Sequence, residues 1–127
     1  MEIEVSRVGE IPIPLINYVY LIKNRKSPYY DLVQFLLKEM EMRYLKSGQS
    51  EVIYTINRRV LQEEIEKKIK SDKLTNINIC RTTLAFLYAS GAKEEKDFYV
   101  TTTGGGKRNY HIVLNKNTLN SFTRLLI

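Results

Sequence analysis

The chain has 127 residues, and its 43% hydrophobic and 27% charged residues are typical of a soluble globular protein with one domain. Its longest apolar run, residues 84–89, is far shorter than the roughly 20 residues that a membrane-spanning helix needs. Cys80 is the single cysteine, which excludes an internal disulfide and favours a reducing, cytoplasmic setting. The chain has one cysteine and one histidine, His111. These are too few ligands for a common zinc site and too few residues for most nucleophile–base pairs. We therefore expect a protein that is not an enzyme and that holds no metal or cofactor.

The basic residues are unevenly distributed along the chain. The net charge is +6, from 20 basic and 14 acidic residues. Residues 1–97 hold 16 basic and 14 acidic residues, whereas residues 98–127 hold four basic residues and no acidic one. A basic end on a nearly balanced body indicates a docking surface for an anionic partner, of which nucleic acid is the commonest. A solvated basic tail would have the same composition.

The N-terminal segment gives the least definite prediction. Residues 11–14 are predicted to be extended, because a residue that precedes proline avoids the helical conformation. The apolar run over residues 15–22 fits either a strand or a short helix that starts at Pro14.

The next segment gives a clear helix prediction over residues 28–46. Ser27 can cap this helix, Pro28 suits its first position, and Gly48 can end it in a left-handed conformation. A short strand is predicted over residues 52–56, which are β-branched or aromatic in most positions.

Two further helices follow this strand. The first is predicted over residues 58–71, with Asn57 as its cap. The second is capped by Thr75 or Asn76 and ends at Gly91.

The last third of the chain predicts a hairpin and a final helix. Residues 98–103 and 108–114 are rich in β-branched and aromatic side chains, and the three glycines at 104–106 permit a tight reversal between them. Asn117 can cap a final helix, whose apolar side is formed by Leu119, Phe122, Leu125 and Leu126.

The order of helix, short strand, helix, helix and basic hairpin resembles the winged-helix form of the helix-turn-helix DNA-binding fold. The resemblance covers residues 28–114, and residues 1–27 and 115–127 would be an N-terminal extension and a C-terminal helix of the same domain. It implies a mostly helical α+β domain whose third core helix lies in the major groove of double-stranded DNA, while the hairpin contacts the backbone or the minor groove. Many proteins of this fold are homodimers through helices outside the core, for which residues 11–24 and 117–127 are the candidates.

The third core helix has two predicted faces. At 100° per residue, one apolar sector is predicted to face the core: Ile77, Cys80, Leu84, Leu87 and Tyr88. A neighbouring stripe is predicted to face a DNA groove: Asn78, Arg81, Thr82, Ala85 and Ala89. Asn, Arg and Thr can pair with base edges, and alanine permits a close approach. The same pattern also fits an ordinary amphipathic helix. Ile79 and Phe86 lie outside both sectors, which predicts a cover from the N-terminal segment or from a second chain.

Four further cations are predicted to contact the DNA backbone. Lys107 and Arg108 lie beside the three glycines, where the main chain can approach a phosphate closely. Arg58 and Arg59, at the start of the second core helix, can meet the same backbone. Basic hairpin tips are also common as features that keep a protein soluble.

The predicted function is sequence-specific binding of double-stranded DNA by a small, homodimeric transcriptional regulator with half-sites about one helical turn apart. The alternative from another class is a winged-helix module that binds other proteins, since a fold does not decide function. A minor alternative is single-stranded nucleic acid or RNA, which can stack on Tyr99 and Tyr110 beside the hairpin cations.

Overall fold

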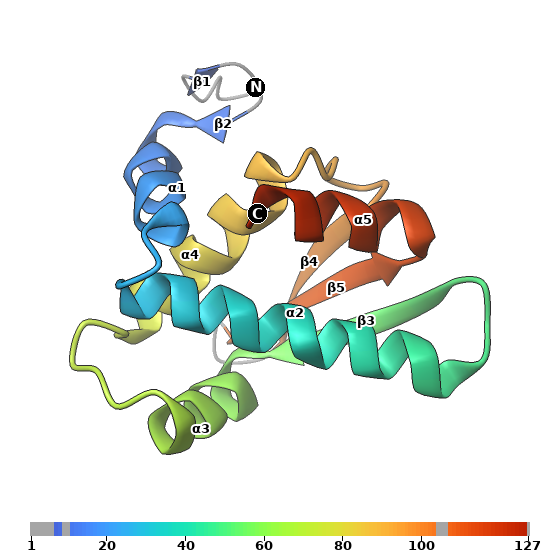
Figure 1. Cartoon of the computed structure of the whole chain (residues 1–127), viewed down its shortest axis with the longest axis horizontal. Helices are drawn as coiled ribbons and strands as arrows, with labels where there is room; N and C mark the ends of the chain where they lie inside the picture. Colours follow the sequence, from blue (N-terminus) through green and yellow to red (C-terminus); the bar gives the residue numbers. More distant parts are fainter. Residues whose placement is uncertain (1–6, 9–10, 104–106, 127) are drawn as a thin grey trace.

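The computed structural model describes residues 7–8, 11–103 and 107–126, which form an α+β fold (Figure 1). Its helices are α1 (Ile16–Lys23), α2 (Pro28–Ser47), α3 (Arg58–Lys68), α4 (Asn76–Ala89) and α5 (Lys116–Leu125). Its strands are β1 (Arg7–Val8), β2 (Ile11–Pro12), β3 (Val52–Asn57), β4 (Phe98–Thr103) and β5 (Lys107–Leu114), and a 3₁₀ turn, η1 (Ile13–Leu15), precedes α1. The predicted mostly helical α+β class is confirmed, and the run over residues 15–22 is helical.

Local capping signals place the helix ends close to the predicted positions. The Ser27 hydroxyl accepts a hydrogen bond from the backbone N–H of Tyr29 at 3.1 Å and begins α2. Gly48 ends this helix with φ at 64°, a left-handed conformation that glycine adopts without steric cost. The Asn57 side chain likewise accepts from the backbone N–H of Arg59 at 3.0 Å and begins α3.

Two helix boundaries differ from the prediction. Helix α3 ends at Lys68 rather than at residue 71, because Ile69 leaves the helical conformation (φ −124°, ψ 101°) and packs against the core. Helix α5 is capped by Asn115 rather than by Asn117. The Asn115 side chain accepts from the Thr118 backbone N–H at 2.9 Å, and the Thr118 hydroxyl accepts from the Asn115 N–H at 2.9 Å. This reciprocal pair satisfies two backbone donors at once.

The three-stranded antiparallel sheet has the order β3–β5–β4, so the last strand of the hairpin is central. Side chains alternate across it. Ile56, Tyr110 and Ile112 are buried on the side that faces the helices, whereas Thr55 is exposed and His111 half-buried on the other side. In Figure 1, α2 crosses in front of this sheet, with α3 below and α5 above it.

Helix α4 is packed on several sides, against α1, α2, α3 and α5. Its Phe86 ring lies 5.2 Å from the Phe122 ring of α5. The predicted core face of this helix is correct for Leu87, which is fully buried, and for Cys80, Leu84 and Tyr88, which pack against the core. It is wrong for Ile77, which is 63% exposed, and it leaves out Ile79 and Phe86, which are each 1% exposed. Apolar and small residues surround most of this helix, so periodicity alone could not identify its exposed side. The N-terminal segment does pack on α4 through α1, as predicted, and Phe122 of α5 covers Phe86 as well.

Candidate nucleic-acid interface

The stripe of α4 that was predicted to enter a DNA groove is largely inside the protein. Thr82 and Ala85 are both 0% exposed. The small side chains that were expected to admit DNA instead lie where the neighbouring helices pack closely on α4. Thr82 and Ala85 are therefore excluded as contacts for a ligand on this surface.

Asn78, at the start of the same stripe, is used for tertiary hydrogen bonds. Its Oδ1 accepts from the Tyr18 hydroxyl of α1 at 2.7 Å. Its Nδ2 donates to the Lys73 carbonyl oxygen at 2.7 Å and to the Tyr29 hydroxyl at 3.4 Å. The amide thus joins α1, α2 and the loop before α4, and it is not free to pair with a base.

Arg81 is the member of the predicted stripe that remains exposed. Ile77, one turn earlier on α4, is exposed as well. Residues four apart lie on one face of a helix. Among the side chains described for the first two turns of α4, these two, a cation and an aliphatic group, are the exposed ones.

The hairpin meets α4 at a buried hydroxyl. Tyr110 of β5 is 1% exposed, and its hydroxyl has no hydrogen-bond partner among the described residues. Burial raises the pKa of the Tyr110 phenol, the Cys80 thiol raises it further, and the Arg108 guanidinium lowers it. Cys80 of α4 and Arg108 of β5 thus act on the pKa of the same phenol in opposite directions. Arg108 shares the helix-facing side of β5 with Tyr110, two residues away, and its own side chain is exposed.

The other predicted hairpin and helix cations have different positions. The side chains of Lys107 and Arg58, and residues 104–106 at the hairpin tip, lie outside the described part of the structure. Arg59 is exposed at the start of α3, where its Nε lies 3.8 Å from the Glu63 carboxylate. A surface pair of this kind contributes little to stability and leaves the guanidinium accessible.

His111 occupies the centre of the sheet's outer face. Its Nδ1 lies 3.0 Å from the Thr55 hydroxyl, and its Nε2 lies 2.8 Å from the Thr101 hydroxyl. The Tyr99 ring stacks on the imidazole with a centroid distance of 4.5 Å. Both ring nitrogens and one ring face are therefore engaged within the sheet, which is a structural role for this histidine.

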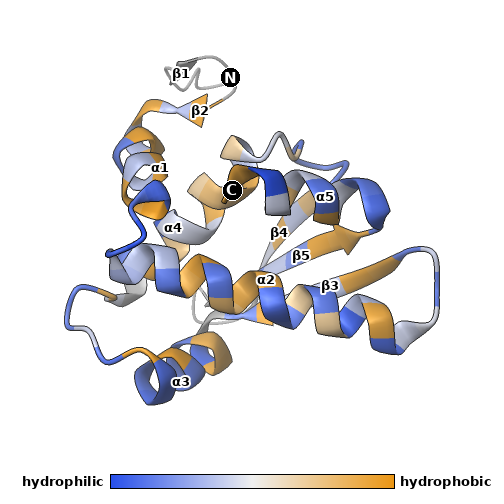
Figure 2. Cartoon of the chain, in the orientation of Figure 1, coloured by the Kyte–Doolittle hydropathy of each residue, from blue (hydrophilic) through white to orange (hydrophobic). Residues whose placement is uncertain are grey.

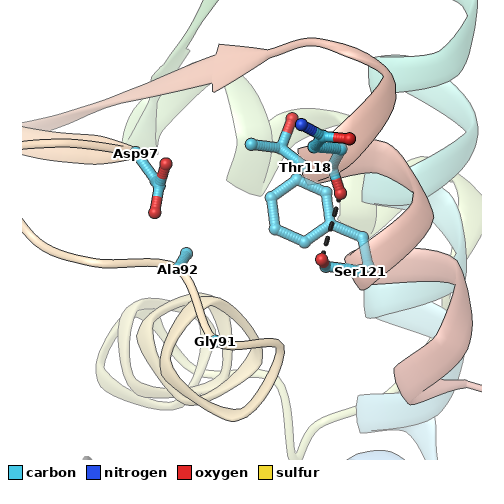
Figure 3. Close-up of a pocket in the computed structure, with 7 residues that line it drawn as sticks. Gly91, Ala92, Asp97, Thr118 and Ser121 are labelled. Carbon is cyan, nitrogen blue, oxygen red and sulfur yellow. Dashed lines mark hydrogen bonds between the residues drawn. The ribbon is translucent and has the colours of Figure 1, made fainter.

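A small hollow between the start of α5 and the loop after α4 does not extend the candidate site (Figure 3). Its volume is about 140 Å³, below the range of typical ligand pockets. Its polar groups already have partners in the protein: Asp97 accepts from the Lys93 N–H at 2.8 Å, and Ser121 donates to the Asn117 carbonyl at 3.0 Å. Within the described residues, no three His, Cys, Asp or Glu side chains are grouped so as to hold a metal ion.

Sequence reasoning missed one group of cations. Lys23 at the end of α1 and Arg25 and Lys26 in the loop that follows it fall within four residues, and all three are exposed. The signal was visible as a short basic run. A charge count over residues 1–97 hides this basic run, because the 14 acidic residues of that segment nearly balance its 16 basic ones.

Comparisons with protein-family models, with curated proteins and with solved structures find no match for this chain. None of the helices in the described part of the chain combines the length and the apolarity that crossing a membrane requires.

Proposed function

We propose that this chain is a winged-helix protein that binds double-stranded DNA through the exposed side of α4 and the β4–β5 hairpin. The observation that supports this most directly is the position of two exposed arginines. Arg81 lies on α4 and Arg108 lies on β5, and both side chains are exposed. The helix and the hairpin that the resemblance assigns to DNA contact each carry one exposed arginine. The element order from α2 to β5 is also the order on which the winged-helix resemblance depends.

The side chains on α4 suit contacts with base edges. Arginine can donate two hydrogen bonds to guanine O6 and N7, and an apolar side chain can contact the methyl group of thymine. Arg81 and Ile77 supply one of each on adjacent turns of the helix. In this proposal, Arg81 and Ile77 make the contacts with base edges that the sequence predicted for Asn78, Thr82 and Ala85.

The hairpin cations suit contacts with phosphate. Arg108 is exposed beside the glycine-rich tip, and we propose that Lys107, Arg58 and Arg59 act with it on the backbone. Contacts of this kind fix the position of a protein on DNA without reading its sequence.

A homodimer remains a prediction. The two segments expected to form the dimer contact provide α1 and α5, and both helices pack against α4 of the same chain. A contact between two chains would therefore use their outward sides, where Tyr20 is 71% exposed. Sedimentation of the protein alone and with DNA tests this, and a monomer in both conditions would contradict it.

The test of DNA binding is fluorescence anisotropy with a labelled random-sequence duplex between about 50 and 200 mM salt. The parent should bind, and its affinity should fall linearly on a log–log plot against salt. Arg108→Ala should weaken binding to all sequences and lower the slope by about 0.9, the value for one phosphate contact. Arg81→Ala should relax the sequence preference found by selection from a duplex library.

Arg43→Ala is the matched control. Arg43 is exposed near the C-terminal end of α2, a helix that is not part of the proposed interface. It should bind like the parent. If Arg43→Ala and Arg108→Ala reduced binding equally, or if the parent bound no duplex at low salt, the proposed interface would be wrong.

The exposure of Ile77 favours a second candidate function, a module that binds other proteins. An exposed aliphatic residue beside an arginine is also suited to a protein interface. Ile77→Asp would then abolish binding to the partner, while the parent would show no affinity for any duplex.

A further inference from the structure

Cations from four separate segments gather at one end of the molecule. The loop between α1 and α2 lies beside the loop between α3 and α4 at the left of Figure 1, and Figure 2 shows both loops as largely hydrophilic. We name residues 23–26 the basic ridge, since they contain Lys23, Arg25 and Lys26. The other cations come from the end of α3, from the loop that follows it and from the end of α5: Lys68, Lys70, Lys73 and Arg124.

Two hollows flank the basic ridge. The first, the lysine hollow, has a volume of about 510 Å³ and is lined by Lys26, Lys68, Lys70 and Lys73, with Asp31 as its single carboxylate. The second, the arginine hollow, has a volume of about 320 Å³. Its charged lining residues are Lys23, Arg25 and Arg124, and none of the described Asp or Glu side chains lines it.

Within the part of the chain that the structure describes, these cations have no close carboxylate partner. Among the described residues, no carboxylate lies within 4.0 Å of any of them, whereas Arg59 on α3 does have such a partner. Lys68 has a weaker neighbour, with its Nζ 4.8 Å from the centre of the Phe35 ring. Like charges that converge without counterions repel one another, so an anionic partner would stabilise this arrangement.

The shape of the surface favours a long polyanion over a small anion. None of the charged side chains that line either hollow is buried, so neither hollow offers the enclosed donors that hold a single phosphate or carboxylate. The charge is instead spread over both flanks of a projecting loop. Double-stranded DNA carries one charge per about 1.7 Å of its axis and can contact such a surface at several points.

The lysine hollow is also joined to α4. The Lys73 carbonyl oxygen accepts the 2.7 Å hydrogen bond from Asn78, which fixes the loop before α4 to the first turn of that helix. Arg81 follows one turn later on α4. Resting on the function proposed above, we propose that the lysine hollow and the basic ridge form a second phosphate-backbone contact for the same duplex, beyond the end that α4 and the hairpin occupy.

The experiment compares a duplex of about one helical turn (about 10 base pairs) with one of about three turns. The test variant is the full chain with Lys26→Gln, Lys70→Gln and Lys73→Gln. The matched control removes three exposed lysines elsewhere, with Lys46→Gln, Lys93→Gln and Lys96→Gln. Binding is measured by anisotropy over the same salt range, and a second probe is a vesicle that contains phosphatidylserine.

The parent should bind the long duplex more tightly than the short one, with a steeper salt slope. The test variant should lose up to about 2.7 of that slope, the value for three phosphate contacts, and bind the short duplex within about twofold of the parent. The control variant should behave as the parent does on both duplexes.

Two results would overturn this inference while leaving the proposed function intact. One is a parent whose affinity and salt slope are the same for both duplexes, while binding to the short duplex still depends on Arg81 and Arg108. The other is a test variant that keeps the parent's slope on the long duplex but loses binding to the vesicle. A parent that binds neither duplex would overturn the proposed function itself, and the inference with it.

Discussion

Helices α3 and α4 are consecutive in the chain, yet they serve the fold in different ways. The core receives Leu61 and Ile65 from α3, and the rest of that helix is largely solvated, with Val60 58% exposed. Helix α4 places six buried residues in the core: Ile79, Thr82, Thr83, Ala85, Phe86 and Leu87. The helix that the winged-helix resemblance would place in a groove is thus also a central core helix, and its accessible surface is narrow.

This difference separates two kinds of residue on α4. Changes at its buried positions should reduce stability and affect binding only through unfolding. Changes at Arg81 and Ile77 should affect binding with little change in stability.

Phe86→Ala should lower the free energy of unfolding by about 3–5 kcal/mol, because it leaves a cavity beside Phe122. Val60→Ala, on the exposed side of α3, should change it by less than about 0.5 kcal/mol. Urea unfolding followed by circular dichroism measures both. Equal losses in the two variants would show that α4 is not more deeply packed than α3.

Asn78→Ala should cost about 2 kcal/mol, because its amide bonds to Tyr18 and to the Lys73 carbonyl would be lost. Asn17→Ala is the matched control at an exposed position of α1 and should change stability little. The same urea experiment measures both. A neutral Asn78→Ala variant with reduced DNA affinity would return Asn78 to the role in base recognition that the sequence first predicted.

Two adjacent threonines of α4 should respond in opposite directions to valine. The Thr82 hydroxyl is buried without a hydrogen-bond partner among the described residues, so Thr82→Val should stabilise the fold by about 1 kcal/mol. The Thr83 hydroxyl donates to the Ile79 carbonyl at 2.8 Å, so Thr83→Val should destabilise it by about 0.5–1 kcal/mol. Thermal unfolding resolves the sign of each change. Destabilisation by Thr82→Val would mean that its hydroxyl has a partner.

We also expect a loss of stability at alkaline pH. Burial and, to a smaller extent, the Glu39 carboxylate raise the pKa of Tyr54 to about 12, against the opposing effect of Arg43. Burial raises the pKa of Tyr110 as well. Because the unfolded phenol loses its proton near pH 10, this stabilisation is complete below about pH 10 and is lost as the pH rises towards the folded pKa.

Substitution by phenylalanine separates the contributions of Tyr54 and Tyr110 to this loss of stability. Tyr110→Phe, beside α4, should flatten this alkaline loss more than Tyr54→Phe, which borders α3, because Tyr110 is 1% exposed and Tyr54 is only partly buried. Urea unfolding at about pH 9 and 11 measures the difference. The reverse order would contradict the deeper burial of the α4 side.

The parts of the fold that depend on neighbouring residues were predictable. Ser27 and Pro28 mark the start of α2, Gly48 marks its end, and Asn57 marks the start of α3, because a cap acts within one turn. The hairpin followed from three glycines between two β-branched segments. Even the cap of α5 was displaced by only two residues, since asparagine occupies both positions.

The candidate site was predicted less completely. Arg81 and Arg108 were identified correctly as exposed cations, whereas Thr82 and Ala85 were assigned to the surface although they are buried. Small residues on a helix fit a close contact with DNA or with another helix equally well. The pattern by itself cannot distinguish the two.

The amino-acid sequence alone determined where the helices and the hairpin begin and end, because capping hydrogen bonds and glycine conformations act over a few residues. Which side of α4 meets water was set by tertiary packing. That choice depends on α1, which is distant in sequence and packs on a helix whose apolar and small residues extend around most of its circumference. Long-range packing also brings separate segments together around the basic ridge. These segments carry Lys68, Lys70, Lys73 and Arg124.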